Sequence, residues 1–554
     1  MQIENQPWLR LWPPDVPRKL EYPKVPLQGF LEKAAEVYPQ KAAIAFADRE
    51  ITYAELAALT DQFAAALAAL GVKKGDRVAV FLPNTPQFII AYYGSLKVGA
   101  LLTAISSLHK EREVEYQLKD AEAETIVALD TLYPIVENVR RKTKLKNIII
   151  TSAEEYAAKA SAAPIRIEQK PNVYLFQELL SEGKKAKPPK VHIDLEEDLA
   201  ALQYTGGTTG TAKGAMLTHR NLVSNAVAFA AWIKGSTEDV FLAALPLFHI
   251  YGMTTSMNVP VYLAAKMVLL PRFEPAAALE AIQRHRVTVF CGVPTMYSLL
   301  LANPALGNFA LTSIRVCISG ASPLPPQVQK RFMEVTGGFL AEGYGLTEAS
   351  PVTHCNPVDK TMRTVRLGSI GLPLPDTDAR IVDAETGEKT LGAGETGELA
   401  VKGPQVMKGY WRRPEETARV LRGGWLLTGD IARMDEDGYF YITDRKKDLI
   451  KYKDYSVYPR ELEDVLYEHP AVRLCAVVGK PDPLVGEIPK AFIVLKDGAK
   501  ASETEIMEFV KEKVAPYKMI REVEFRKELP ISAAGKVLRR MLQEEEKQKL
   551  TNKR

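Results

Sequence analysis

The chain contains 554 residues, 46% of them hydrophobic, which is enough for several domains with sizeable cores. Its 72 basic and 68 acidic residues leave a formal net charge of +4, and no basic stripe interleaved with aromatic residues appears, which argues against a nucleic-acid partner. The four cysteines lie far apart with no CxxC pair, which disfavours a zinc ribbon or a thiol redox site. We expect them to be reduced and buried in a cytoplasmic protein.

The N-terminal third predicts an extended arm followed by a parallel sheet. Residues 1–26 lack the apolar core of a signal peptide, and their prolines favour an arm that lies on the body of the protein. Apolar strands then alternate with helical patterns; the strands are "RVAVFL" (77–82), "ALLTAI" (100–105), "TIVAL" (125–129) and "NIIIT" (147–151). This alternation predicts a doubly wound parallel sheet, and a polar linker at 181–190 ends this first array.

The stretch "YTGGTTGTAKG" (204–214) comes after the apolar run "LAALQY" and combines glycines, hydroxyls and one lysine. Glycines let backbone amides approach an oxyanion, and hydroxyls and a lysine add donors for phosphate oxygens. It is not a Walker P-loop, because Lys213 is followed by glycine rather than by serine or threonine. We interpret it as a phosphate-binding loop rather than as a flexible polar surface loop.

A second array of strands and helices comes next, with strands "VFLAAL" (240–245), "KMVLLP" (266–271), "VTVF" (287–290) and "IRVCIS" (314–319). Residues 240–265 carry no formally charged side chain, but prolines, His249 and several hydroxyls interrupt the run. A buried strand, loop and helix is therefore the better interpretation than a membrane span.

The rhythm changes near Gly368, where short turns between strands predict an antiparallel barrel or meander. Within it, "GAGETG" (392–397) matches GxGxxG but leads into a strand, whereas a dinucleotide-binding fingerprint leads into a helix. We interpret this match as a hairpin coincidence. From Arg445 onward, mixed strands and helices predict a small α+β domain of roughly 110 residues.

Two later motifs are weak when each is taken alone. In "YGLTEAS" (344–350) a glutamate could hold Mg²⁺ beside phosphates and a tyrosine could stack on a base. In "TGD" (428–430) an aspartate suits the hydroxyls of a ribose. For each of them a capped turn is the alternative.

The ordered set "YTGGTTGTAKG", "PLFHIYG", "SGASPL", "GYGLTE", "TGD", "DRKKDLIKYKDYSVYP" and "AAGKVLRR" resembles the adenylate-forming acyl-CoA synthetases over nearly the whole chain. Within that family it looks closest to bacterial long-chain fatty-acid–CoA ligases. The resemblance implies an α/β fold whose large N-terminal lobe, residues 1–444, contains two doubly wound sheets and a β-barrel. It also implies a small mobile C-terminal domain, residues 445–554, that carries a catalytic lysine.

The resemblance implies a role for each matching position. The β- and γ-phosphates of ATP would be bound by the loop residues Thr205, Gly206, Gly207, Thr208, Thr209, Gly210 and Lys213. The adenine and its pocket would involve Gly320, Ala321, Ser322, Gly343, Tyr344 and Gly345, and the ribose Asp430 and Arg445. Catalysis and metal binding would involve Thr347 at the α-phosphate, Glu348 with Thr205 at Mg²⁺, Lys536 as the mobile lysine and His249 beside the acyl carboxylate, with Lys447 as the hinge.

Some of these positions have simpler alternatives. Lys536 could be a solvated lysine before a charged helix, His249 a core histidine, and Glu348 a helix-start charge. Asp454 and Ser456 depart from the glycine and glutamine that are frequent in the family, at a loop expected to face the pantetheine tunnel. These two departures bear on how CoA is placed. The residues that the resemblance assigns to adenylation match the family pattern.

The resemblance implies ATP-dependent activation of a medium- to long-chain fatty acid, followed by transfer to CoA, with ATP and CoA as co-substrates and Mg²⁺ as cofactor. The alternatives are an aryl (cinnamate-like) acid–CoA ligase, an adenylating enzyme that loads a carrier protein, and an inactive ATP-binding sensor. "PLFHIYG" offers no acid to pair a substrate ammonium, and no carrier domain comes after Lys536, which favours CoA. Peripheral membrane contact stays open, as does the choice between a monomer and a homodimer.

Overall fold

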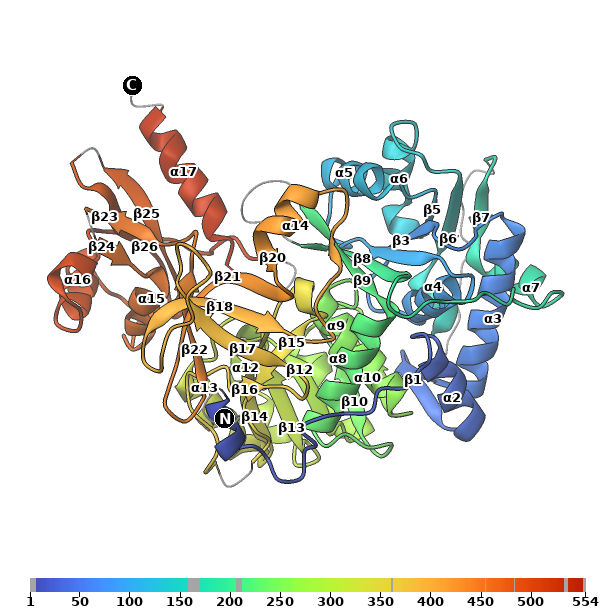
Figure 1. Ribbon diagram of the computed structural model, residues 1–554, viewed down its shortest axis with the longest axis horizontal. Helices are drawn as coiled ribbons and strands as arrows, with labels where there is room; N and C mark the ends of the chain where they lie inside the picture. Colours follow the sequence, from blue (N-terminus) through green and yellow to red (C-terminus); the bar gives the residue numbers. More distant parts are fainter. Residues whose placement is uncertain are drawn as a thin grey trace.

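The computed structural model describes residues 6–157, 170–205, 212–359, 362–453, 455–482, 484–532 and 537–551. Their fold is α/β, as predicted, with two large, mainly parallel sheets and two smaller five-stranded sheets. In Figure 1 the first parallel sheet and the C-terminal sheet lie at opposite ends of the molecule, with the second parallel sheet between them.

The first large sheet has eight strands in the order β19-β9-β8-β4-β3-β5-β6-β7. Its parallel strands are β3 (Arg77–Phe81), β4 (Leu101–Ala104), β5 (Thr125–Leu129), β6 (Asn147–Thr151), β7 (Val173–Leu175) and β8 (Leu199–Thr205). Two antiparallel strands, β9 (Lys213–Thr218) and β19 (Gly409–Tyr410), extend it past β8. The glycine-rich loop therefore joins two antiparallel strands, and a helix begins only after β9.

The second large sheet has nine strands in the order β16-β15-β14-β13-β12-β10-β11-β1-β2. They are β1 (Ala42–Phe46), β2 (Arg49–Thr52), β10 (Val240–Ala243), β11 (Lys266–Leu269), β12 (Val289–Gly292), β13 (Val316–Ser319), β14 (Phe339–Gly345), β15 (Val352–Cys355) and β16 (Leu372–Pro373). The strands from β1 through β11, β10, β12 and β13 to β14 pair in parallel. The first hairpin of the chain, β1–β2, thus completes this second sheet.

Helices cover the faces of these sheets, as the strand–helix alternation predicts. They are α2 (Gly29–Val37), α3 (Tyr53–Ala69), α4 (Pro86–Lys97), α5 (Glu111–Ala121), α6 (Tyr133–Arg140), α7 (Phe176–Gly183), α8 (His219–Trp232), α9 (Ile250–Met253), α10 (Val259–Tyr262), α11 (Pro275–His285), α12 (Pro294–Leu301) and α13 (Pro326–Thr336). Local sequence explains many of their ends: Thr52 and Glu55 form a capping box at the start of α3, and Gly337 ends α13 with φ +66°.

The largest hydrophobic core joins the two large sheets into one body. It contains buried side chains from the first sheet, such as Val80, and from the second, such as Phe241. Separate clusters lie on the far side of each sheet, around Ile126 in the first and Phe290 in the second. Since strands buried on both faces are apolar throughout, their sequences read as continuous hydrophobic runs.

The predicted barrel is wrong: the antiparallel segment forms an open five-stranded sheet. Its strands are β17 (Asp378–Val382), β18 (Thr396–Lys402), β20 (Leu421–Arg422), β21 (Trp425–Met434) and β22 (Phe440–Arg445). The order is β17-β18-β21-β20 with β22 also on β21, and within the described residues no pairing closes it. "GAGETG" ends in β18 rather than in a helix, as the hairpin interpretation expects.

The last sheet contains β23 (Ile450–Tyr452), β24 (Tyr455–Val457), β25 (Val472–Asp482), β26 (Gly486–Leu495) and β27 (Glu522–Phe525). With it come α15 (Pro459–Tyr467), α16 (Glu503–Lys511) and α17 (Arg539–Thr551). This part has hydrophobic clusters of its own, one of which begins at Ile450. Figure 1 shows it as the orange and red end of the molecule.

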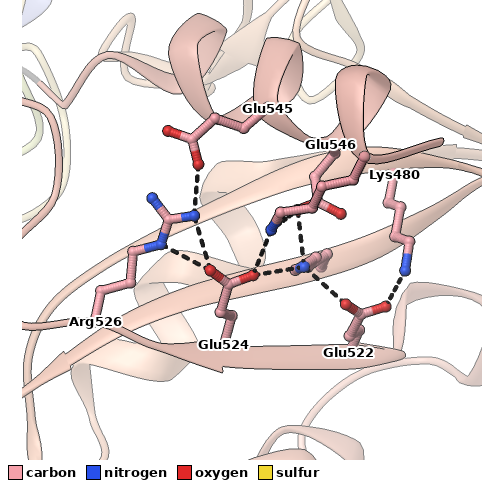
Figure 2. Close-up of polar contacts among 8 residues, drawn as sticks. Lys480, Glu522, Glu524, Arg526, Glu545 and Glu546 are labelled. Carbon is pink, nitrogen blue, oxygen red and sulfur yellow. Dashed lines mark hydrogen bonds and ion pairs between the residues drawn. The ribbon is translucent and has the colours of Figure 1, made fainter. Parts of the chain in front are cut away.

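An ion-pair network fastens α17 to this last sheet (Figure 2). Lys490 on β26 is only 3% exposed and pairs with Glu522, Glu524 and Glu546 at 2.7–2.9 Å. Glu546 on α17 is 1% exposed. A buried charge is tolerated only when it is paired, so the network fixes how α17 lies on the sheet.

Replacing Lys490 with methionine is expected to lower the free energy of unfolding of this C-terminal part by about 1–3 kcal/mol. The loss stays below that of a fully orphaned buried charge because each carboxylate keeps another cation, as Glu546 keeps Lys549. Urea unfolding followed by circular dichroism measures it. Lys511→Ala, which breaks an exposed ion pair with Glu508, is the matched control and should change the free energy of unfolding little. Equal losses of stability in the two variants would contradict the role of Lys490 as a buried, paired charge.

The N-terminal arm lies on the body, as predicted. Trp8 is buried and packs on Phe440, and Trp12 contacts Trp232 edge-on. All four cysteines are free and buried. Residues 240–265 form β10, two short helices and a π-helical turn, and no helix among the described residues has both the length and the apolar character to cross a membrane.

Candidate active site

Tyr344, Asp430 and Arg445 form one cluster although they lie far apart in the sequence. Asp430 and Arg445 face each other on the paired strands β21 and β22, with Arg445 Nε 3.1 Å from Asp430 Oδ1. The Tyr344 hydroxyl donates to Asp430 Oδ2 at 2.5 Å. Burial, together with the charge of Asp430, raises the pKa of Tyr344, so its phenol stays protonated as a donor. The cluster holds a carboxylate in a fixed position.

A hollow of about 400 Å³ opens beside this cluster, and its lining consists of Thr428, Gly429, Asp430, Arg445, Lys446 and Lys447. Gly429 has φ +75°, a conformation that favours glycine, and no atom lies within 4 Å of where a Cβ would stand. The Lys446 backbone N–H donates to the Gly429 carbonyl at 3.0 Å, which ties the residue after β22 to the middle of β21. Polar and charged groups therefore surround open space on one side of the small open sheet.

The predicted adenine-pocket residues stand at the ends of two neighbouring parallel strands. Gly320, Ala321 and Ser322 come directly after β13, and Gly343 to Gly345 end β14, its parallel partner. The carboxyl ends of adjacent parallel strands meet at one edge of a sheet, where ligands bind in open α/β folds. Close packing requires glycine at Gly345, because a Cβ there would lie 2.1 Å from the carbonyl oxygen of Pro351.

The two ends of the predicted phosphate loop are held by β8 and β9. Thr205 and Lys213 are opposite residues of this antiparallel pair. Tyr116 of α5 donates to the Ala212 carbonyl at 2.7 Å, and the Trp411 backbone N–H donates to the Gly214 carbonyl at 2.8 Å. The predicted ligands between them, Gly206, Gly207, Thr208, Thr209 and Gly210, lie outside the described residues.

Lys213 and Glu348, the two predicted charged ligands of the phosphates and the metal, are joined through Tyr410. The Lys213 ammonium forms an ion pair with Glu416 of α14 (Pro414–Val420) and lies 5.0 Å from the centroid of the Tyr410 ring. The Tyr410 hydroxyl donates to Glu348 Oε1 at 2.6 Å. A cation and a carboxylate therefore contact the same tyrosine.

Glu348 lies in a short 3₁₀ turn, Thr347–Ala349, after β14. Its backbone carbonyl accepts from Met407 N at 2.8 Å, which fixes the turn against the segment that leads to β19. Among the residues described, no group of three or more His, Cys, Asp or Glu side chains could hold a metal. Mg²⁺ bound together with phosphates needs only one or two protein carboxylates, so Glu348 fits that use.

His249 lies at the start of α9. Its Nδ1 accepts from the backbone N–H of Tyr251 at 3.2 Å, so the ring caps the helix. Tyr251 packs its ring against Gly320, where a Cβ would lie 3.1 Å away. The Phe248 carbonyl accepts from Gln203 of β8 at 2.7 Å. These contacts place His249 between the strand that leads to the phosphate loop and the predicted adenine pocket.

The predicted hinge lies between the end of β22 and the start of β23. Lys447 is exposed here, and near it the buried Asp444 accepts from Arg460 N at 2.7 Å. Arg539 binds Asp444 at 3.3 Å and Asp448 at 3.4 Å. Lys536 and Asp454 lie outside the described residues, as does the side chain of Ser456.

The structure thus brings the predicted ribose pair together with Tyr344, and joins Lys213 to Glu348. Sequence reasoning missed two residues of this arrangement, Tyr410 and Glu416. Glu416 lies in the first turn of a helix, where an acidic residue is ordinary. The only available signal was that "GYWRRPEE" crowds aromatic and charged residues into eight positions.

Comparisons with known proteins concern the chain as a whole and its fold. A family model described as AMP-binding enzyme matches residues 31–411, and one described as AMP-binding enzyme C-terminal domain matches 461–536. A long-chain-fatty-acid–CoA ligase of Bacillus subtilis is 46% identical, over 98% of this chain and 98% of that protein. A feruloyl-CoA synthase of an Amycolatopsis species is 34% identical, over 92% of this chain and 96% of that protein. The ATP-bound crystal structure of MatB from Rhodopseudomonas palustris is 31% identical, covers 94% of this chain and 99% of its own, and superposes with a TM-score of 0.83.

Proposed function

The chain belongs to the AMP-binding enzyme family, whose models match most of its length, and we propose that its acid substrate is a medium- to long-chain fatty acid. It is an ATP-dependent acid–CoA ligase that forms an acyl-adenylate and then an acyl-CoA. The observation that carries the choice of substrate is the 46% identity, over nearly the full length, to a long-chain-fatty-acid–CoA ligase.

The described residues suit the binding of ATP. Thr205 and Lys213, at the ends of the predicted loop, would bind the β- and γ-phosphates, which leave as pyrophosphate. The Asp430 carboxylate, fixed by Arg445 and Tyr344, would accept from the hydroxyls of the ribose. The adenine would lie against Tyr344 and the glycines that end β14.

Adenylation needs no nucleophile from the protein, because the carboxylate of the substrate attacks the α-phosphate itself. Catalysis then consists mainly of positioning and charge neutralisation. Thr347 would contact the α-phosphate, and Lys536 would bridge it to the incoming carboxylate. Mg²⁺, for which Glu348 and Thr205 are the proposed ligands, supplies positive charge when bound.

The acyl group would lie along the segment that begins at His249. Residues 240–265 contain no formally charged side chain, and the π-helical turn Thr254–Asn258 within them is buried. π-Helical turns occur frequently at functional sites. An uncharged, methionine-containing segment suits an alkyl chain and offers no cation for a second carboxylate.

The thioester step requires access for the thiol of CoA. A thiol of pKa near ~8.5 attacks an acyl-adenylate when it is partly ionised. We propose that the β23–β24 hairpin faces the pantetheine in that state. Tyr455, beside the two departures at Asp454 and Ser456, is 52% exposed and stacks on Tyr517, so an aromatic face is available there.

A panel of acids tests the proposed substrate class. With ATP, Mg²⁺ and CoA, pyrophosphate release is expected to rise with medium- and long-chain fatty acids and to stay flat with free amino acids. Activity with an amino acid equal to that with a fatty acid would remove the fatty-acid proposal.

An aryl acid is the second candidate, and the 34% identity to a feruloyl-CoA synthase favours it. Ferulate and cinnamate therefore belong in the same panel. Loading of a carrier protein is distinguished by replacing CoA with a phosphopantetheinylated carrier domain. Transfer to free CoA at the higher rate is the expected result.

A further inference from the structure

Tyr410 contacts both charged groups that the proposed function assigns to ATP and its metal. It belongs to the two-residue strand β19 and pairs with Ala215 of β9, and its side chain is buried. Its hydroxyl donates to Glu348 Oε1 at 2.6 Å, and the face of its ring lies 5.0 Å from the Lys213 ammonium.

The backbone of Tyr410 is held independently of these two contacts. Its N–H donates to Thr417 Oγ1 at 2.9 Å, and the chain on either side pairs with β9: Lys408 N donates to the Met216 carbonyl at 2.9 Å and Trp411 N to the Gly214 carbonyl at 2.8 Å. Because the strand is anchored on both sides, the position of the Tyr410 backbone does not depend on the contacts with Glu348 and Lys213. The ring can therefore orient the side chains that contact it.

The hydroxyl has one chemical role here, which is to donate to a carboxylate. A tyrosine phenol carries one O–H donor, and here it donates to Glu348 Oε1. A hydrogen bond to an ionised acceptor is shorter and stronger than a neutral one. Carboxylates that bind metals are usually oriented by such a donor, and loss of the donor typically weakens metal binding about 10- to 100-fold.

The ring has a different role, which is to hold a cation. An aromatic face attracts an ammonium group. Lys213 lies over this face while it also pairs with Glu416, so two groups restrain a flexible side chain at the end of the phosphate loop. A buried tyrosine needs only one hydrogen-bond partner, which a backbone carbonyl often supplies. That this tyrosine contacts a carboxylate and a cation goes beyond that need.

We propose that Tyr410 is a positioning residue of the nucleotide site, whose hydroxyl holds Glu348 for a divalent cation and whose ring holds Lys213 for phosphate. The inference rests on the proposed function, since it assumes that Glu348 and Lys213 serve ATP. It assigns two separable effects to two parts of one side chain.

Two variants separate these effects by binding measurements without any acid substrate, so that no reaction occurs. Tyr410→Phe keeps the ring and removes the hydroxyl. The Mg²⁺ concentration that half-saturates ATP binding, measured by calorimetry, is expected to rise about 10-fold or more. The affinity for pyrophosphate in EDTA should not change. Tyr410→Leu removes the ring as well. In this variant the half-saturating Mg²⁺ concentration should rise and the affinity for pyrophosphate in EDTA should fall.

Tyr441→Phe is the matched control, because the Tyr441 hydroxyl also donates to a carboxylate, that of Asp435, at 3.0 Å. It should leave both quantities unchanged. In a Glu348→Gln background, Tyr410→Phe should add little further loss, because residues that act through one another are not additive.

The outcomes distinguish a failure of this inference from a failure of the proposed function. If the wild-type protein binds ATP with Mg²⁺ and Tyr410→Phe has the same Mg²⁺ dependence, the positioning role is wrong and the proposed function stands. The positioning role would also be wrong if Tyr410→Phe weakened metal-free pyrophosphate binding as strongly as it weakens Mg²⁺ binding. A general loss of structure would explain that result. Wild-type protein that binds no ATP with Mg²⁺ would overturn both.

Discussion

Replacing Glu348 with glutamine is expected to slow acyl-adenylate formation on the order of 10²-fold or more, because the carboxylate proposed to hold a metal beside the phosphates is lost. The change is nearly isosteric, and the amide oxygen can still accept from the Tyr410 hydroxyl. The Mg²⁺ requirement should weaken along with the rate. Pyrophosphate release, measured across a Mg²⁺ titration with saturating fatty acid, reports both.

Glu415→Gln is the control for this substitution, since Glu415 is exposed in the first turn of α14, one residue before Glu416. It should leave the Mg²⁺ titration as it is in the wild type. If Glu348→Gln also leaves that titration unchanged, Glu348 serves only as a charge at the start of a turn, and the metal assignment is wrong.

Replacing Lys447 with proline is expected to leave acyl-adenylate formation near normal while acyl-CoA output falls by orders of magnitude. In the proposed mechanism Lys536 approaches the α-phosphate for adenylation and leaves before a thiol reaches the adenylate, which requires the part after Arg445 to rotate. Few residues join β22 to β23, so the rotation depends on their φ and ψ. Proline fixes φ near about −65° and also restricts the preceding Lys446.

Two further variants complete the test by measuring each half-reaction separately. Lys447→Ala keeps the freedom of the backbone and should slow neither step much. Lys536→Ala should block adenylation yet still convert supplied acyl-adenylate to thioester. If Lys447→Pro and Lys536→Ala each slow both half-reactions equally, one static arrangement performs all the chemistry, and the rotation does not occur.

The parallel strands could be predicted because each is a short apolar run between turn signals. All four strands predicted in the first array, and all four in the second, are present. The prediction of a barrel was wrong because alternation of apolar and polar residues along a strand indicates a hairpin. It does not show whether the first and last strands of the sheet pair. Here Phe440 of β22 bridges to Gly371, outside the open sheet, instead of closing it.

The site was predictable only where its residues stand in compact motifs. Tyr344 and Asp430 each lie in such a motif, and the structure adds the hydrogen bond between them. Tyr410 could not be predicted, because its partner Glu348 lies 62 positions away and nothing local marks the pair. Such a contact arises from the pairing of β19 with β9, which joins distant parts of the chain.

The most direct test of two-step ligation through an acyl-adenylate is a single-turnover reaction monitored by ³¹P NMR. Enzyme is mixed with ATP, Mg²⁺ and a long-chain fatty acid, first without CoA and then with it. We expect pyrophosphate and an enzyme-bound acyl-adenylate in the first stage, in equal amounts, and AMP with acyl-CoA after CoA is added. Release of ADP and inorganic phosphate, or no pyrophosphate until CoA is present, would contradict it.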